Sequence, residues 1–237
     1  MKLSGIWNQA LLLWPLVFKR VWPWVLFTLF IDICSNFMTN FIRQLDERFI
    51  ISAAGLAISI QLVVSAFSMI IINQVTFDVK NRIDSNIFKA LSANLKYIII
   101  ETTRALLPIL LKILLFIVPG IIEAVRLYFV PFVVQFDSKY KTGQIDALKQ
   151  SRALVQGNLM KVMGILILTM LLSIVPRLCL HSVTRLETAF LFSAALFMCL
   201  VLETYSFIVM YCVYEKLTHA SKETNGHSIS LSGASQS

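Results

Sequence analysis

Five ionisable side chains occur inside long apolar runs of this chain, where charged groups are unusual. They are Asp32, Lys112, Glu123, Arg126 and Glu203. A charge near the middle of a membrane-spanning helix costs roughly 2.5–3.5 kcal/mol, so such a group usually faces protein or water and finds a partner. Two interpretations stay open: the five residues form a polar path for an ion or charged substrate, or they form ion pairs that fix how helices pack.

Spacing predicts which of these charges meet. Asp32 and Lys112 are expected at similar depths in parallel helices and form one candidate pair. Glu123 and Arg126 are three residues apart, so they are neighbours on one helix face. Glu101 and Arg104 repeat that spacing.

The chain lacks the sequence signatures of catalysis. It contains no Gly-x-Ser-x-Gly elbow, no Walker-type loop and no dinucleotide fingerprint. His181 has no second histidine at ligand spacing. The four cysteines form no Cys-x-x-Cys pair and are expected to be small buried hydrophobes. We therefore expect no enzyme activity, no cofactor and no metal.

Composition predicts a membrane protein. The 237 residues are 57% hydrophobic and only 14% charged, against ~25% charged in an average soluble domain. Apolar runs of this length are what a bilayer requires. We expect an all-α polytopic membrane helix bundle with about six transmembrane helices in one domain, residues 1–216, followed by a disordered cytoplasmic tail, 217–237. The expected spans are 21–40, 50–77, 98–118, 121–136, 159–176 and 189–214.

The spans are expected as three hairpins, each preceded by a short interfacial helix. The interfacial helices are predicted at 4–19, 78–96 and 137–157. Pro119 and Gly120 are expected at the tip of the central hairpin, because neither residue continues a helix well. An alternative is that residues 98–136 dip into the bilayer and return without crossing it.

The distribution of positive charge predicts orientation. Fifteen of the 21 Lys and Arg residues fall on the side that carries both termini, and two lie inside the apolar runs. The opposite side receives Arg43, Arg48, Arg177 and Arg185. Positive loops stay cytoplasmic, so both termini are expected in the cytoplasm. The expected partner of the basic surface helices is anionic lipid and not nucleic acid; a membrane-protein partner or a second copy is also possible.

A motif within residues 113–169 carries a family resemblance. An apolar span ends in Pro119-Gly120, and the next span has an early arginine, Arg126. The polar connector that follows contains Ala147, Leu148, Ser151 and Gly157. This pattern resembles the YciC family of bacterial inner-membrane proteins and is similar to the membrane domain fused to some glycerophosphodiester phosphodiesterases. The resemblance implies a multi-pass inner-membrane fold and no assigned biochemical activity.

Gly157 is expected where the connector helix turns sharply into the next span, a bend that a side chain would obstruct. For the whole chain, the expected role is membrane or envelope organisation through helix packing and partner binding. The alternative is a small transporter or lipid-handling protein that uses the intramembrane charges.

Overall fold

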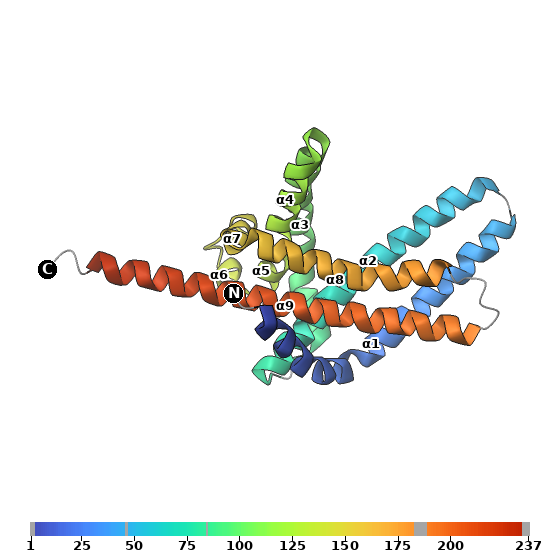
Figure 1. The fold of residues 1–237 in the computed structure, drawn as a ribbon, viewed down its shortest axis with the longest axis horizontal. Coiled ribbons are helices and arrows are strands. Elements are labelled where there is room, and N and C mark those ends of the chain that lie inside the picture. Colours follow the sequence, from blue (N-terminus) through green and yellow to red (C-terminus); the bar gives the residue numbers. More distant parts are fainter. Residues whose placement is uncertain (1–2, 46, 84, 183–188, 234–237) are drawn as a thin grey trace. The chain divides into compact units, whose positions relative to one another are not determined.

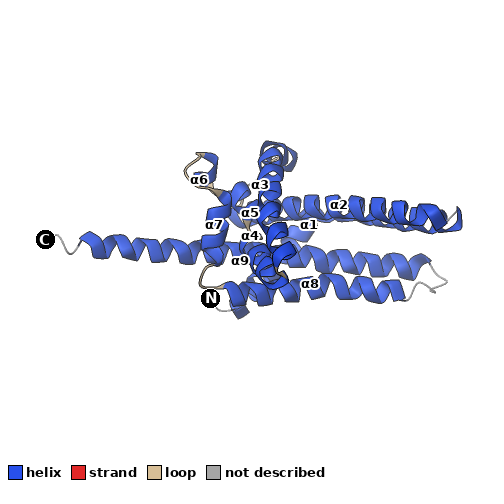
Figure 2. Cartoon of the chain, turned by 90° about the horizontal axis from the view of Figure 1, so that it is seen from above, coloured by secondary structure: helices blue, strands red, loops and turns tan. Residues whose placement is uncertain are grey.

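The computed structural model describes the backbone of residues 3–45, 47–83, 85–182 and 189–233, and side chains within 4–35, 55–172 and 194–221, apart from positions 57, 58, 62, 84 and 88. Regular secondary structure in these ranges is entirely helical, as the sequence predicts (Figures 1 and 2). The helices are α1 (Leu3–Leu45), α2 (Glu47–Asn81), α3 (Ile87–Leu115), α4 (Ile117–Leu127), α5 (Val130–Phe136), α6 (Ser138–Lys141), α7 (Ala147–Val155), α8 (Leu159–Ser182) and α9 (Ala189–Gly233).

Several of these helices have the length and apolarity to cross a bilayer. Within the described part of the chain, three segments qualify: Ser59–Asn81, Ile117–Phe136 and Ala194–Ser221. A fourth is formed by Ala147–Val155 with Leu159–Leu172, if that strongly bent pair is one span. Membrane association is therefore supported by three or four segments, and six spans in three hairpins stay a prediction.

All three predicted interfacial helices differ from the structure. Residues 137–157 are divided into α6, which ends at Lys141, and α7, which begins at Ala147. Residues 4–19 are not a separate helix, because α1 continues through Pro15 and Pro23. Residues 78–96 are not continuous, because α2 ends at Asn81 and α3 begins at Ile87. The backbone of Arg82 has a positive φ of 56°, and the Ile83 N–H donates to the carbonyl of Asp78 at 2.9 Å. That bond closes a helix-ending turn, which the four-residue repeat of apolar side chains does not reveal.

The chain divides into two compact units. Unit 1 contains Met1–Trp7, Phe88–Ile167 and Met210–Ser237, and unit 2 contains Asn8–Ile87 and Leu168–Val209. The core of unit 1 is aromatic: Phe132 on α5 packs against Tyr214 on α9, with ring centroids 5.4 Å apart. Phe129 and Phe136 contact the same tyrosine ring. Aromatic packing thus joins α5 to the last part of α9 within unit 1.

Unit 2 has a core of aliphatic side chains from α1, α2 and α9. Val21, Ile72 and Leu200 are among its buried residues. The indole Nε1 of Trp24 donates to Ser68 Oγ at 3.0 Å, so a hydrogen bond also joins α1 to α2.

Helices α3 and α4 form an antiparallel hairpin whose turn lies earlier than the sequence predicts. Only Phe116, with extended backbone (φ −155°, ψ 126°), separates the two helices. Pro119 and Gly120 lie in the first turn and a half of α4, and not at the tip. The first turn of a helix tolerates proline because its N–H groups have no intrahelical partner.

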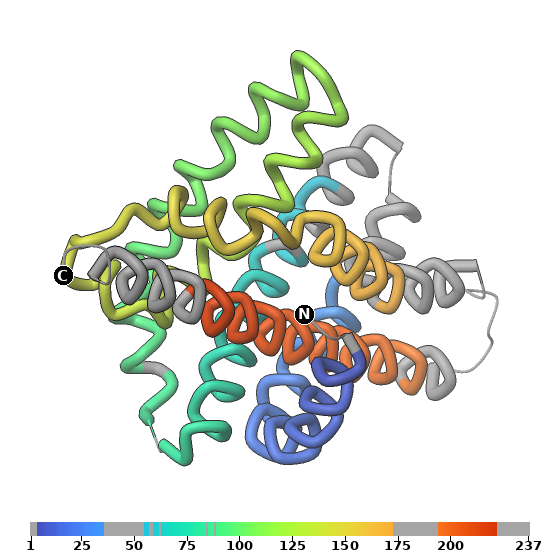
Figure 3. Tube along the Cα trace, turned by 60° about the vertical axis from the view of Figure 1, so that its left-hand side comes forward, coloured from blue at the N-terminus to red at the C-terminus, as the bar shows by residue number. Residues whose placement is uncertain are grey.

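Gly120 has a packing role in this hairpin. A Cβ at Gly120 would lie 2.3 Å from Ile113 Cγ1 and 2.7 Å from its backbone nitrogen. The glycine therefore permits a backbone-to-backbone approach of the two arms, which lie side by side in Figures 1 and 3.

Between α7 and α8 the chain turns by 97°. Gly157 lies in this turn with φ +85°, and a Cβ there would meet nothing within 4 Å. The sharp bend is confirmed, but the expected steric reason for the glycine is wrong. What excludes other residues is the left-handed backbone conformation, which glycine adopts without penalty.

The last helix extends past the last expected span. The backbone of α9 is helical to Gly233, beyond residue 217, where the tail was expected to begin. Disorder of the tail as a whole stays a prediction.

Candidate functional site

Among the described side chains of unit 1, the most enclosed charged group is Glu123 on α4, whose side chain is 2% exposed. Lys112 Nζ, at the end of α3, donates to its Oε2 at 2.6 Å. Arg152, at the end of α7, donates to its Oε1 through Nε at 2.7 Å and lies 2.6 Å away through Nη2. Both carboxylate oxygens are therefore bonded, and one side chain joins three helices.

Local geometry positions this triad. Because the hairpin turns at Phe116, the last turn of α3 faces the second turn of α4, which places Lys112 opposite Glu123. Helix α7 is fixed beside α4 by a second contact, in which Ser151 Oγ donates to the Arg126 carbonyl at 2.7 Å. The triad carries two positive charges and one negative charge, and Lys112 and Arg152 remain 44% and 41% exposed.

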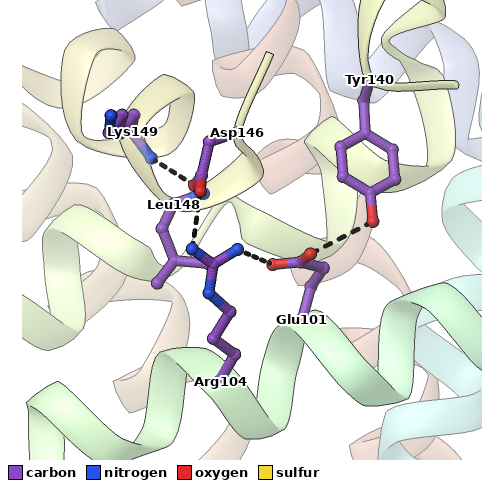
Figure 4. A network of polar contacts seen from close by, with 6 residues as sticks. All are labelled: Glu101, Arg104, Tyr140, Asp146, Leu148 and Lys149. Atoms are coloured by element: carbon purple, nitrogen blue, oxygen red, sulfur yellow. Dashed lines mark hydrogen bonds and ion pairs between the residues drawn. The ribbon is translucent and has the colours of Figure 1, made fainter. Parts of the chain in front are cut away.

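A second polar network lies further from the hairpin tip (Figure 4). Arg104 Nη2 donates to Asp146 Oδ2 at 2.7 Å, and Arg104 Nη1 lies 3.4 Å from Glu101 Oε2. The Tyr140 hydroxyl donates to Glu101 Oε1 at 3.3 Å. The predicted Glu101–Arg104 pair is confirmed, and it is part of a larger network that links α3 to the α6–α7 segment.

Asp146 has two structural tasks in this network. It is the N-cap of α7, where Oδ1 accepts from the backbone N–H groups of Leu148 at 2.9 Å and Lys149 at 3.2 Å. Partial burial alone would raise the pKa of the Asp146 carboxyl, but the hydrogen bonds from Arg104 and the two N–H groups outweigh it and lower the pKa below its usual value. The pKa of Tyr140 is raised, first by burial and then by the charge of Glu101.

Unit 2 contains a small cavity lined by both apolar and polar side chains. Its lining includes Thr28, Gln61, Ser65, Ser68, Glu203 and Thr204, and its volume is about 20 Å³. Ser65 Oγ donates to Glu203 Oε1 at 3.0 Å. A space of this size holds about one water molecule.

The five predicted site residues are divided between the two units. Lys112, Glu123 and Arg126 lie in unit 1, and Asp32 and Glu203 lie in unit 2. The structure brings Lys112 to Glu123, and Asp32 is buried on α1. The Asp32–Lys112 pair stays a prediction. Glu123 and Arg126 share a helix, but the bonds to the Glu123 carboxylate come from Lys112 and Arg152, and the Arg126 side chain is exposed.

The connector motif can be recognised in the sequence, but the ion pairs made by its neighbouring residues cannot. Ala147, Leu148 and Ser151 are buried. The adjacent Arg152 is the ion-pair partner of Glu123 that the sequence did not predict. Asp146 and Tyr140 were also missed. For Asp146 a signal exists, since an aspartate immediately before a helical pattern is a favoured N-cap; no local signal indicates the reach of Arg152 across 29 positions.

The cysteines partly follow the prediction. Cys199 and Cys212 are buried and form no disulfide, and Cys34 is exposed. Cys179 and His181 lie outside the described side chains. In the described part of the chain, no group of three or more His, Cys, Asp or Glu side chains is close enough together to hold a metal ion.

The geometry therefore supports charge neutralisation inside a helical, membrane-associated protein. Comparisons with protein-family models, curated proteins and solved structures find no match to this chain. The resemblance to the YciC family accordingly remains a prediction from residues 113–169.

Proposed function

We propose that this chain is a multi-pass protein of a bacterial inner membrane that has no catalytic site and organises the membrane or envelope through helix packing and partner binding. The observation that carries the proposal is Glu123, whose two carboxylate oxygens are both bonded to cations of neighbouring helices. A charge that transports an ion must exchange partners, whereas a buried, fully bonded charge is suited to fixing the register of helices.

The membrane placement is supported by the apolar helices and by the charge distribution. Segments such as Ala194–Ser221 are long enough to cross the hydrocarbon region. The excess of Lys and Arg on one side of the predicted topology supports cytoplasmic termini. Those basic residues attract anionic lipid, with about 1 kcal/mol per Lys or Arg near the surface.

A second candidate function is transport or lipid handling, and the cavity beside Glu203 favours it. Six of the cavity's lining side chains are polar, and they come from α1, α2 and α9. Because the cavity holds about one water molecule, any larger substrate requires these helices to separate. A Glu203→Gln variant distinguishes the two functions. If Glu203 takes part in transport, the transport rate falls at least tenfold. If the protein acts by partner binding, that binding is unchanged.

The test of the leading proposal is purification of the full chain in a mild detergent, with co-purifying proteins and lipids identified by mass spectrometry. A stoichiometric protein partner, or a defined oligomer of this chain, supports membrane organisation. A stoichiometric lipid without a partner supports the second function. Recovery of the chain in the soluble fraction, without detergent, overturns both.

Orientation has its own experiment. Green fluorescent protein fused to the C-terminus is expected to fluoresce, and alkaline phosphatase fused at the same position is expected to be inactive, because the former matures in the cytoplasm and the latter in the periplasm. The opposite pattern contradicts cytoplasmic termini.

A further inference from the structure

The tip of the α3–α4 hairpin exposes an unbroken group of large apolar side chains. Leu114 is 85% exposed, Phe116 71% and Val118 67%, with Leu107 and Leu110 above 50% on the preceding turns. Contiguous apolar surface of this kind marks contact with a protein, a ligand or a membrane. Because the residues surround the tip on both arms, they fit a fluid hydrocarbon environment better than a single flat partner.

The base of the same hairpin is tied to a segment that belongs in water. Arg104 on α3 is bonded to Asp146, and the residues just before Asp146 are exposed and polar, including Lys139, Lys141 and Gln144. A segment with that composition is excluded from hydrocarbon. The Arg104–Asp146 bond therefore places Arg104 at the level of the water interface.

The length of the arms then limits the depth of the tip. Phe116 lies twelve residues after Arg104, a rise of about 18 Å along a helix. The hydrocarbon region is ~30 Å thick, so the tip reaches roughly its middle. The returning helix α4 has 11 residues, about 16 Å, and Ser151 and Arg152 of α7 already contact it at Arg126 and Glu123.

The second half of the Ile117–Phe136 segment also supports a hairpin tip that stops near the middle of the membrane. Ile117–Phe136 is apolar enough to cross a membrane, but its second half is α5, whose residues Val130, Phe132 and Val133 are buried within unit 1. Apolarity there is explained by protein packing. The outgoing arm α3 is not among the segments that qualify as spans in the described chain; it carries Glu101, Arg104 and Lys112.

We propose that the α3–α4 hairpin enters one leaflet from the side that holds residues 138–149 and returns to that side, with the acyl chains of that leaflet as its partner. This inference rests on the proposed membrane function and selects the non-crossing alternative for residues 98–136. Lys112 lies eight residues beyond Arg104, about 12 Å along α3, and is then inside the leaflet, where its bond to Glu123 neutralises its charge.

The test is a depth profile by spin labelling. Single cysteines replace the exposed residues Thr103, Leu107, Leu111, Leu114 and Val118, in a chain whose four native cysteines are alanine, reconstituted into phosphatidylcholine–phosphatidylglycerol vesicles. The ratio of collisions with oxygen to collisions with a water-soluble nickel chelate rises with depth. We expect it to increase steadily from 103 and to be highest at 114 and 118, by at least tenfold over a Lys139→Cys control.

A crossing hairpin gives a different profile, with the maximum near 107–111 and a fall at the tip, and that result overturns the proposal. So does low collision with both reagents at 114 and 118, which indicates a protein partner or a second copy. Chains that do not sediment with vesicles contradict the proposed membrane function, and the proposed depth of the hairpin falls with it; sedimenting chains with a crossing profile contradict the depth alone. The wild-type chain, labelled by carbene lipids with the reactive group at the acyl-chain end, provides a second measurement: modification centred on 114–118 is expected, and modification centred on 105–110 contradicts the proposal.

Discussion

The backbone of Gly120 on α4 approaches Ile113 on α3 so closely that a Cβ would lie 2.7 Å from the Ile113 nitrogen and 2.8 Å from its Cα. Backbone atoms in the middle of a hairpin cannot move aside as the end of a side chain can. The close approach of the two arms therefore requires glycine at position 120, because any other residue has a Cβ.

Gly120→Ala is expected to lower the free energy of unfolding by about 1–3 kcal/mol, as overpacking does. Thermal unfolding in detergent measures this. Gly164→Ala is the matched control: its Cβ would meet nothing within 4 Å, so it should be neutral or stabilise by about 0.4–1 kcal/mol. The loss should persist in an Ile113→Ala background, because the clash is with backbone. Equal stability of the two alanine variants contradicts the packing described here.

Glu123→Gln removes the charge that Lys112 and Arg152 share. A fully buried ion pair that loses one partner costs ~3–5 kcal/mol, and exposed pairs are worth at most ~1 kcal/mol. Since both cations are about two-fifths exposed, the loss should fall between these limits. A double-mutant cycle with Lys112→Met should show a coupling above 0.5 kcal/mol. Lys149→Met, on the exposed side of α7, is the control for the loss of a positive charge. If the stability losses of Glu123→Gln and Lys112→Met are additive, the ion-paired triad is contradicted.

Ser151→Ala leaves the Arg126 carbonyl without its hydroxyl donor. That carbonyl is in the last turn of α4, where carbonyls lack intrahelical partners, and an unsatisfied buried acceptor costs about 1–3 kcal/mol. Unfolding of the variant should show this loss. Ser92→Ala, which removes an exposed hydroxyl bonded to the Lys89 carbonyl, should change stability by less than 0.5 kcal/mol. A similar effect at both serines would count against a specific role for Ser151.

Gly157→Ala is expected to destabilise the turn between α7 and α8 by about 1–2 kcal/mol, because alanine resists φ +85°. Gly157→Asn should lose less, since asparagine adopts the left-handed region more readily. This ranking of the two variants distinguishes the two explanations for the glycine. Steric obstruction would make the larger asparagine more destabilising than alanine, which is the opposite ranking. Both variants are compared by thermal unfolding.

The Asp146 carboxyl predicts a pH dependence. Its pKa is lower in the folded chain than in the unfolded chain, so its contribution is fully present above the unfolded value of ~3.9 and is lost as pH falls through the folded value. Wild-type chain should therefore lose its stability advantage over Asp146→Asn below about pH 4 and keep it constant between pH 5 and 7. Asparagine retains the N-cap, which makes it the suitable comparison. An advantage that grows on acidification contradicts this assignment.

Local signals predict this fold better than its site. Apolar runs predict the helices, and the three-residue spacing of Glu101 and Arg104 predicts their contact. The hairpin turn was placed three residues late because proline and glycine have uses besides breaking helices: Pro119 is accommodated in a first turn, and Gly120 allows close approach. Whether Arg126 or Arg152 pairs with Glu123 depends on how α7 packs against α4. The three-residue spacing of Glu123 and Arg126 does not reveal that packing.

Helix α7 is tied at both ends, through Asp146 to one arm of the hairpin and through Arg152 to the other. Both ties are synthesised after the arms they join. During translation, Glu123 emerges with Lys112 as its available partner, and the second cation arrives only when residue 152 has left the ribosome. We therefore expect the hairpin to gain its second cationic contact only after residue 152 has been synthesised, so that its two arms are less constrained before that point. Nascent chains arrested before and after residue 152 should differ in protease resistance of the hairpin.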